Sequence, residues 1–441
     1  MAGFANYVYD LGERVCSPEC LLTPLAVRKM IFSWLSLIIG NATSKIIIFA
    51  SLPIISRIYE PSSIGELSYF ISVGEIISSC ATLSLPLGIP LEKNHEKTFV
   101  LIKTAQNISY VFSILTLVTL CIYFYMEDKK INTEHAIWIA ALPIYIIFSS
   151  HINIYTSIAI KTKNLKLIPK SNIVASISSS SIKIFGSLIS NTFFTLITAT
   201  LISQTIQIVT FITHTQNYYF SKPTFKKQIQ TIMENKDLII YRTPQQLLSI
   251  VSISLPLFFL SITSSKEQTG YYAMAMNTLF IPVNIIATAT FQIYYSHLTS
   301  SNDSRETKNK ALKKVTVFLL LASLPMAVFI YIFSPEIYRI VFGEVWINSG
   351  KYASALVIWL VFMVINKPIV ASLTTIHKQK QLFIYEATGT VVKLFSLAAC
   401  FYFEYNPMTT IELYSLTSAF FYVILITWGY RELKNHEKEY V

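Results

Sequence analysis

Charged residues are scarce in this chain. Only 13% of its 441 residues are Asp, Glu, Lys or Arg, whereas 53% are hydrophobic and the mean hydropathy is +0.52. A soluble domain carries about 25% charged residues because its surface faces water. Half that fraction excludes a soluble enzyme or a nucleic-acid-binding protein. Together with long apolar runs from end to end, it predicts a polytopic membrane protein.

Residues and motifs that support catalysis are also missing. The four aspartates all lie outside the apolar runs, which excludes a D-x-D site for a metal and a nucleotide sugar. There is no G-x-x-x-x-G-K-[ST], H-E-x-x-H or G-x-S-x-G motif. Among the five cysteines, Cys16 and Cys20 have no second pair with which to complete a metal site. We therefore predict no catalytic residue, no metal site and no cofactor.

The apolar runs divide into twelve stretches, each long enough to cross the hydrocarbon core as an α-helix. They cover residues 31–56, 64–90, 99–125, 136–160, 168–189, 192–213, 238–262, 270–296, 315–334, 352–376, 382–402 and 410–430. The prediction is an all-α protein with two lobes of six helices. The predicted parts are an N-terminal segment (1–30), an N-lobe (31–213), a basic inter-lobe loop (214–237), a C-lobe (238–430) and a C-terminal tail (431–441).

Lys and Arg are unevenly distributed between the loops on the two sides. One side, which includes both termini and the residues 214–245, carries 25 of the 35 basic residues, and the other side carries 6. The positive-inside rule therefore places both termini in the cytoplasm. The remaining four lysines lie within predicted spans: Lys45, Lys183, Lys367 and Lys393.

A short pattern occurs in both predicted lobes. Leu52-Pro53 is followed by Gly65 at the start of the second span, and Leu255-Pro256 is followed by Gly270 at the start of the eighth. Transporters commonly consist of two related halves with the substrate site between them. The pattern indicates an internal duplication, although Leu-Pro and Gly can also recur by chance in apolar sequence.

Two predicted spans of the N-lobe carry opposite charges at one depth. Lys45 and Glu75 are each about 15 residues from the turn that joins spans 1 and 2, so antiparallel helices place them level with each other. A charge at the bilayer centre costs about 3 kcal/mol and usually faces a partner or a water-filled interior. The pair predicts either a structural ion pair or a cationic substrate contact beside a titratable, ion-coupling carboxylate.

Further charges occur in the other spans. Glu386 and Lys393 are seven residues apart and share one helix face, while Lys367 precedes Pro368, which disrupts a helix and frees a carbonyl group. Lys183 can snorkel to an interface. Four lysines against two glutamates predict an internal cavity suited to a phosphate or diphosphate. A structural network within the bundle is the alternative.

Two arginines lie at the ends of spans. Arg57 ends the first span on the outer side, and Arg242 begins the seventh on the inner side, before Pro244. Arginines at such positions either anchor a helix at the head groups or contact an anionic substrate.

Several stretches together resemble one family. Arg57, Tyr59, Pro61 and Gly65 match an R-x-Y/L-x-P-x-x-x-G signature of the first hairpin in bacterial polysaccharide flippases. The regions that resemble later parts of the same family are 255–292, 342–353 and 377–381. The chain thus resembles the Wzx-type flippases of O-antigen and capsule repeat units, within the superfamily that also contains multidrug exporters and the peptidoglycan-lipid flippase.

The resemblance implies a function that spacing alone does not give. The substrate would be an undecaprenyl-diphosphate-linked oligosaccharide, moved from the cytoplasmic to the periplasmic face of the bacterial inner membrane by alternating access. The residues expected to bind the diphosphate follow from their positions in the predicted spans, and not from the resemblance: they are Lys45, Lys367, Lys183, Lys393, Arg57 and Arg242. Glu75 or Glu386 would couple the cycle to H⁺ or Na⁺. Polysaccharide polymerase and chain-length proteins are the expected protein partners.

Two other functions stay open. A multidrug or other lipid exporter of the same fold would use acidic residues for cationic drugs, whereas the charges predicted inside this bundle are mainly basic. A membrane polysaccharide polymerase would need a large periplasmic loop, and the loops on that side are about a dozen residues or shorter.

Overall fold

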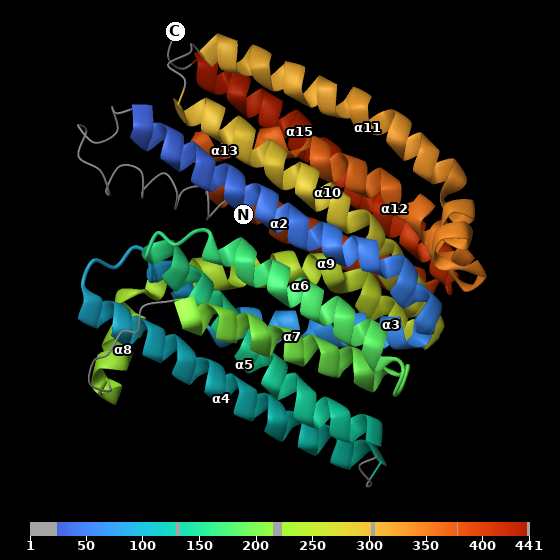
Figure 1. Cartoon of the computed structure of the whole chain (residues 1–441). Coiled ribbons are helices and arrows are strands. Elements are labelled where there is room, and N and C mark those ends of the chain that lie inside the picture. Colours follow the sequence, from blue (N-terminus) through green and yellow to red (C-terminus); the bar gives the residue numbers. More distant parts are fainter. Residues whose placement is uncertain (1–23, 129–132, 215–222, 301–304, 377, 439–441) are drawn as a thin grey trace. The chain divides into compact units, whose positions relative to one another are not determined.

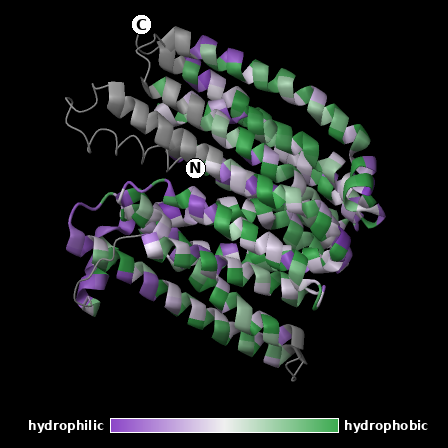
Figure 2. Cartoon of the chain, in the orientation of Figure 1, coloured by the Kyte–Doolittle hydropathy of each residue, from purple (hydrophilic) through white to green (hydrophobic). Residues whose placement is uncertain are grey.

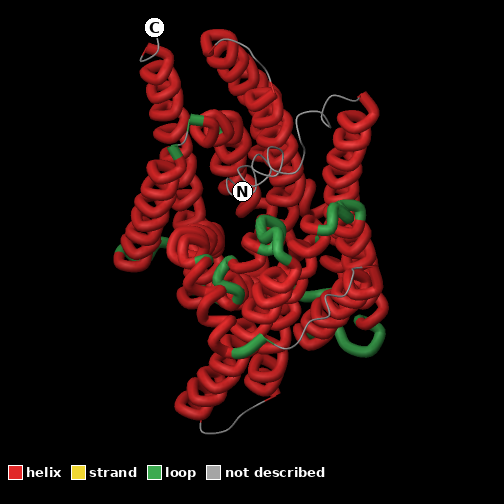
Figure 3. The backbone as a smooth tube through the Cα atoms, turned by 90° about the vertical axis from the view of Figure 1, so that its left-hand side faces the viewer, coloured by secondary structure: helices red, strands yellow, loops and turns green. Residues whose placement is uncertain are grey.

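A computed structural model describes residues 24–128, 133–214, 223–300, 305–376 and 378–438. Within these ranges the chain forms helices joined by short connections, and no strand occurs in them (Figure 3). Residues 1–23, with Cys16 and Cys20, lie outside the described residues, as do 215–222 of the inter-lobe loop and His377.

Twelve long helical segments match the twelve predicted spans (Figure 1). The first six are α2 (Pro24–Ile58), α3 (Pro61–Ala81), α4 (His95–Asp128), α5 (Thr133–Lys161), α6 (Leu167–Gly186) and α7 (Phe193–His214). A short helix, α8 (Phe225–Glu234), lies in the predicted inter-lobe loop. The others are α9 (Thr243–Thr263), α10 (Lys266–Ser300), α11 (Arg305–Phe342), α12 (Ile347–Ile365) continued by α13 (Lys367–Thr375), α14 (Gln379–Tyr402) and α15 (Pro407–Lys438).

Nine helical segments among the described residues are long and apolar enough to span a membrane. The long helices outside this set are α2, α3 and α6. Two of these three are visibly polar: α3 contains Glu66 and Glu75, and α6 combines Lys170 and Lys183 with a run of serines. The all-helical membrane architecture predicted from the sequence is confirmed, and its least apolar helices carry ionisable residues.

The second predicted span is interrupted near its end. The sequence predicts a continuous helix over 64–90, but α3 ends at Ala81. Leu83 and Ser84 adopt positive φ angles of 50° and 54° before the 3₁₀ turn η2 (Leu85–Gly88). Pro86 disfavours a continued helix because it lacks an N–H and crowds the preceding turn. Since Pro53 and Pro143 lie inside the continuous helices α2 and α5, Pro86 acts here together with the packing of η2.

The chain forms two compact units. The N-terminal unit contains Val27–Tyr59 and Glu66–Ser254, and the C-terminal unit contains Glu60–Gly65 and the chain from Leu255 onward. In the N-terminal unit, α6 packs with α7 and α5 packs with both α4 and α7. In the C-terminal unit, α12 is the central helix and packs against α10, α11 and α15. The predicted lobe boundaries stay a prediction.

The core of the C-terminal unit surrounds α12 and α13. Trp346, Tyr352, Trp359 and Ile369 are each less than 3% exposed. The helix is interrupted at Asn366, where α12 ends and α13 begins with Lys367 and Pro368 at its first positions. The break that Pro368 predicts therefore lies within the best-packed helical segment of this unit.

Candidate functional site: buried charges within the two units

The N-terminal unit contains a carboxylate held by a tyrosine. Glu75 of α3 accepts a hydrogen bond of 2.6 Å at Oε1 from the hydroxyl group of Tyr145 in α5. One turn along each helix, Ser149 Oγ donates to Ser78 Oγ at 3.3 Å. The two contacts place polar groups of α3 and α5 face to face inside the unit, with the carboxylate at their centre.

A glycine makes room for this contact. A Cβ atom added at Gly74 would lie 2.5 Å from the Tyr145 ring, so only glycine lets the ring cross α3 beside Glu75. Sequence reasoning identified Glu75 but missed Tyr145, which is 70 residues away and shares no motif with it. Gly74, directly before an acidic residue within an apolar run, is the local signal that could have indicated a close approach.

Lys45 is the cationic neighbour of this carboxylate. Its positive charge acts on Glu75, and its side chain is exposed on α2. The structure therefore brings the two charges into one neighbourhood while the hydrogen bond of the carboxylate comes from Tyr145. Because Glu75 accepts its hydrogen bond from Tyr145 and not from Lys45, an anionic group can approach the exposed Lys45 without breaking that bond.

The helices α2 and α6 meet along a row of polar contacts. Asn172 donates to Asn41 Oδ1 at 2.9 Å, Ser180 donates to Ser51 Oγ at 3.0 Å, and Tyr59 donates to the backbone oxygen of Lys183 at 2.8 Å. Gln207 of α7 adds a bond of 2.8 Å to Asn172. Lys183 is half-buried at the end of this row. Amides and hydroxyls here bond helix to helix, so they stabilise the unit.

The C-terminal unit contains three interacting charges. Lys367 at the start of α13 and Lys393 of α14 both act electrostatically on Glu386 of α14. Lys393 is buried, with Nζ 6.0 Å from the ring centroids of Tyr414 and Tyr422 in α15, which is cation–π distance. The sequence predicted that Glu386 and Lys393 share a face, but not the tyrosines that flank Lys393.

The side chains of the cluster differ in exposure. Glu386 is exposed and Lys367 is half-buried, whereas Lys393 is only 9% exposed. Asn366 is 2% exposed and its Oδ1 has no hydrogen-bond partner among the described residues. A buried, unsatisfied acceptor beside a helix break is costly in a folded protein and often marks a position with a function.

The two predicted arginines lie at helix ends. Arg57 is exposed in the last turn of α2. Arg242 is half-buried at the end of η3 (Leu238–Arg242), a π-helical turn before α9, and its Nη1 donates to Gln245 Oε1 at 3.1 Å. Single π-helical turns occur frequently at functional sites. Nearby, Thr243 donates to Ser84 Oγ at 3.1 Å, which links this turn to the strained residues after α3.

The predicted site residues thus form separate groups within the units. The N-terminal unit contains the Glu75, Tyr145 and Lys45 group, with Lys183, Arg57 and Arg242 elsewhere in it. The C-terminal unit contains the group of Lys367, Glu386 and Lys393. Among the described residues, no three His, Cys, Asp or Glu side chains lie close enough together to hold a metal ion.

Comparison with solved structures defines the fold. An inward-facing multidrug resistance MATE family transporter of the MOP superfamily aligns with a TM-score of 0.67 at 14% identity, over 91% of this chain and 99% of that chain. The lipid II flippase MurJ, in an inward closed conformation, aligns with a TM-score of 0.68 at 17% identity, over 91% of this chain and 90% of that chain. The molecule is an all-helical membrane protein with the fold shared by these transporters.

The sequence comparison then gives the family. The profile of a family described as polysaccharide biosynthesis protein matches residues 91–351, more than half of the chain. The chain belongs to this polysaccharide biosynthesis protein family. No curated protein sequence matches it. The family and the fold together agree with the resemblance found in the sequence to polysaccharide flippases.

Proposed function

We propose that this protein is a flippase that moves an undecaprenyl-diphosphate-linked oligosaccharide repeat unit, of an O-antigen or a capsule, across the bacterial inner membrane. Transport runs from the cytoplasmic to the periplasmic face by alternating access between two six-helix lobes. The polyprenyl tail stays in lipid while the diphosphate and sugars cross through the interior. No covalent bond changes in this reaction, so the protein acts as a transporter and not as an enzyme.

The observation that carries the proposal is the basic character of the charged groups within a fold otherwise built of apolar helices. Lys367 and Lys393 accompany one carboxylate in the C-terminal unit, and Lys45 accompanies one in the N-terminal unit. Placing unbalanced positive charge inside a membrane protein is costly, so an anionic substrate is the natural partner. Two lysines match the two phosphate groups of a diphosphate.

Arg57, Arg242 and Lys183 are assigned secondary roles. Arg242 lies on the predicted inner side, where a head group enters, and Arg57 lies on the predicted outer side, where it leaves. Lys183 serves as a further cationic contact near the Arg57 end, where Tyr59 donates to its backbone oxygen. These assignments rest on the predicted topology, with both termini in the cytoplasm.

Glu75 and Glu386 are proposed to couple transport to H⁺ or Na⁺. Glu75 supports this role because Tyr145 and Ser149 both hydrogen-bond its side chain and so hold the carboxylate in one position beside the charge of Lys45. If the cation is released when a substrate phosphate approaches Lys45, cation movement and substrate movement are linked. Polysaccharide polymerase and chain-length proteins are the proposed partners that receive the delivered units.

The decisive experiment uses a strain without this protein and asks on which membrane face the lipid-linked repeat units accumulate. Single units trapped on the cytoplasmic face support the flippase. Single units on the periplasmic face mean that flipping still occurs and favour a polymerase. Restoration of transport by the wild-type gene, and not by a Lys393→Ala variant that is inserted at the same level, connects the phenotype to the proposed site.

A multidrug exporter is the second candidate, because a multidrug resistance MATE family transporter shares the fold. The same strain tests it through its susceptibility to cationic drugs. Increased susceptibility with normal surface polysaccharide would favour the exporter. Normal susceptibility with loss of surface polysaccharide would favour the flippase.

A further inference from the structure

The short helix α8 has an apolar face that none of the described residues covers. Phe225, Ile229 and Met233 are 75%, 45% and 65% exposed. They are spaced by four residues, so they share one face of the helix. Outside the spanning helices such a face contacts water, unless something covers it.

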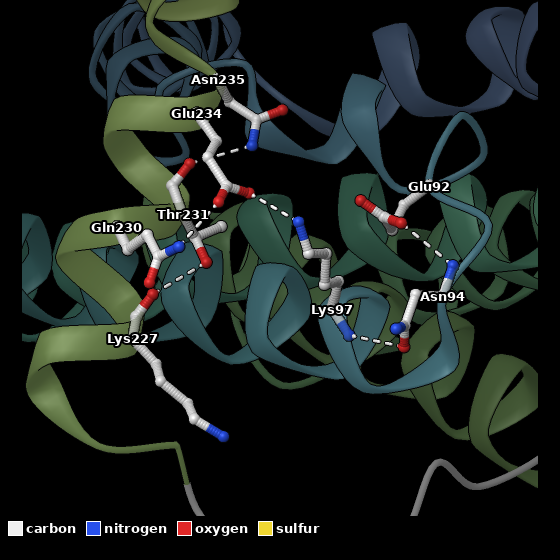
Figure 4. A network of polar contacts seen from close by, with 8 residues as sticks. All are labelled: Glu92, Asn94, Lys97, Lys227, Gln230, Thr231, Glu234 and Asn235. Atoms are coloured by element: carbon white, nitrogen blue, oxygen red, sulfur yellow. Dashed lines mark hydrogen bonds and ion pairs between the residues drawn. The ribbon is translucent and has the colours of Figure 1, made fainter.

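The opposite face of α8 is fixed to α4 by polar contacts. Lys97 of α4 pairs with Glu234 at 3.1 Å, and Lys227 pairs with Glu96 of α4 at 2.7 Å. Asn107 donates to Gln228 Oε1 at 3.1 Å. Figure 4 shows Lys97 reaching across to Glu234 from the neighbouring helix. Lys227, Gln228 and Glu234 of α8 therefore contact α4, and the apolar side chains of α8 take no part in these contacts.

The end of α8 is well defined. The Asn235 backbone N–H bonds to the oxygens of Thr231 and Ile232, and its side chain donates to Thr231 O at 2.9 Å (Figure 4). Gln230 donates to Glu234 Oε1 at 2.9 Å. These bonds satisfy the last carbonyl groups of a helix too short to be stable alone. The apolar face is thus presented in a fixed orientation.

The part of α4 that binds α8 lies at the level of the head groups. Glu96 and Lys97 lie just before the predicted span 99–125, and Asn107 lies about two turns inside it. The contacts with α8 therefore lie at the polar end of this span, whose uncharged part follows Lys103. Figure 2 shows hydrophilic residues gathered in α8 and at the start of α4, next to the apolar remainder of α4.

The surface of α4 beyond α8 faces lipid. Val111, Ile114 and Leu115 are 55%, 60% and 57% exposed, as expected of side chains that contact acyl chains. Because α8 is attached to α4 at the depth of the head groups, α8 is adjacent to lipid. Its free apolar face is continuous with an existing lipid-facing surface.

We propose that α8 is an interfacial helix whose apolar residues Phe225, Ile229 and Met233 insert into the adjacent leaflet. Lys226 flanks the apolar face and Lys236 follows the helix, and both side chains are exposed. Their charge directs α8 to anionic phospholipids, as basic residues do beside the apolar face of interfacial helices. The segment between the two predicted lobes is thereby anchored to the membrane surface.

The test compares two fluorophore positions in the full chain. A cysteine-free variant carries either Met233→Cys on the apolar face or, as the control, Thr224→Cys at the exposed polar start of the helix, where the side chain makes no capping bond. Each is labelled with bimane and reconstituted into vesicles of phosphatidylethanolamine and phosphatidylglycerol. Nitroxide-labelled lipid and aqueous iodide serve as quenchers.

We expect lipid nitroxide to quench position 233 several-fold more than position 224, and iodide to show the reverse order. Equal quenching by iodide at both positions would place the face in water and overturn the proposal. Protection of position 233 from both quenchers would mean that a protein covers it, which would also overturn it. Nitroxide quenching at 233 that does not fall in vesicles without phosphatidylglycerol would overturn the role of Lys226 and Lys236.

Discussion

Gly65 of α3 and Gly270 of α10 face each other, and each packs against the carbonyl group four residues before the other. A Cβ atom at Gly65 would lie 2.6 Å from Gly270 N and 2.8 Å from Lys266 O, and one at Gly270 would lie 1.8 Å from Pro61 O. These are the two glycines that the repeated sequence pattern equates. The reciprocity of their contact is what a two-fold-related helix pair produces, and it supports the internal duplication.

This crossing predicts a large effect of a small substitution. Gly270→Ala forces a methyl group against the Pro61 carbonyl, which belongs to the backbone and cannot rotate away. We expect overpacking to destabilise the C-terminal unit by about 1–3 kcal/mol. The measurement is thermal unfolding in detergent, followed by thiol labelling of Cys400, which is 2% exposed in the folded unit.

Gly389→Ala is the matched control. Its added Cβ would meet only the Phe421 ring, at 3.2 Å, and a side chain can shift by a few tenths of an ångström. We expect a much smaller change in the midpoint of unfolding than for Gly270→Ala. Equal midpoints for both variants would show that α3 and α10 do not cross as closely as described.

The second prediction concerns the proposed coupling carboxylate. Glu75→Gln keeps the size of the side chain and can still accept from Tyr145, but it cannot carry the negative charge that a coupling cation requires. We expect flipping in proteoliposomes to lose its dependence on an imposed H⁺ or Na⁺ gradient. Glu412→Gln, at an exposed position of α15, should retain it. A gradient-dependent wild-type rate in Glu75→Gln would refute the coupling role.

The third prediction concerns the tyrosine that holds this carboxylate. Tyr145→Phe removes one hydrogen bond to a charged group and leaves the ring packed against Gly74. Such bonds contribute about 1.5–3 kcal/mol. We expect the protein to fold and be inserted normally while its gradient dependence weakens. An unchanged gradient response would show that Tyr145 has only a packing role.

The fourth prediction concerns Lys393. Lys393→Met preserves an unbranched chain between Tyr414 and Tyr422 but removes the charge proposed to bind a phosphate. Loss of one charge-assisted contact corresponds to roughly a tenfold or greater loss of substrate affinity. Lys351→Met, at an exposed position of α12, is the control. If Lys393→Met and Lys351→Met bind a lipid diphosphate equally well, the cationic site is assigned to the wrong residue.

The fifth prediction follows from the attachment of α8. Hydrogen bonds from Lys97 and Gln230 lower the pKa of the Glu234 carboxyl group. A carboxyl group whose pKa is lower in the folded state stabilises the fold above its unfolded pKa, and this contribution is lost as the pH falls through the folded pKa. We therefore expect the Lys97–Glu234 contact to help hold α8 against α4 at neutral pH, and the attachment of α8 to weaken below about pH 4.

Paired spin labels at positions 110 and 226, which leave Lys97, Gln230 and Glu234 unchanged, would measure this weakening as a wider distance distribution in acid. In Glu234→Gln the pairing with Lys97 is absent at every pH, so the distribution should depend less on pH. A wild-type distribution that is identical at pH 7 and pH 3.5 would contradict the role of the Lys97–Glu234 pair.

Helix positions could be predicted from the sequence because apolar length is a local property. All twelve predicted spans correspond to helical segments, and Pro368 correctly indicates the break between α12 and α13. The early end of α3 was missed, although Pro86 and Pro90 occur there, because hydropathy does not respond to backbone geometry. The positive φ angles of Leu83 and Ser84 depend on the packing of η2, which no local pattern encodes.

Partners of the buried charges could not be predicted in the same way. Helical periodicity places Glu386 and Lys393 on one face, but the tyrosines beside Lys393 come from α15. Tyr145 reaches Glu75 because α3 and α5 pack together, and nothing near either residue specifies that packing. The apolar face of α8 could not be predicted from hydropathy either, because the segment that contains it is polar overall.

The low apolarity of α6 has a consequence for how the protein is made. A helix with two lysines and a serine run gains little when it passes alone from the translocon into lipid. The next helix, α7, is apolar enough to cross and packs closely on α6. We therefore expect α6 to stay in the translocon until α7 is synthesised and the two helices to enter the bilayer together as a hairpin. The hydroxyl groups of α6 are then packed against α7 before they are exposed to acyl chains.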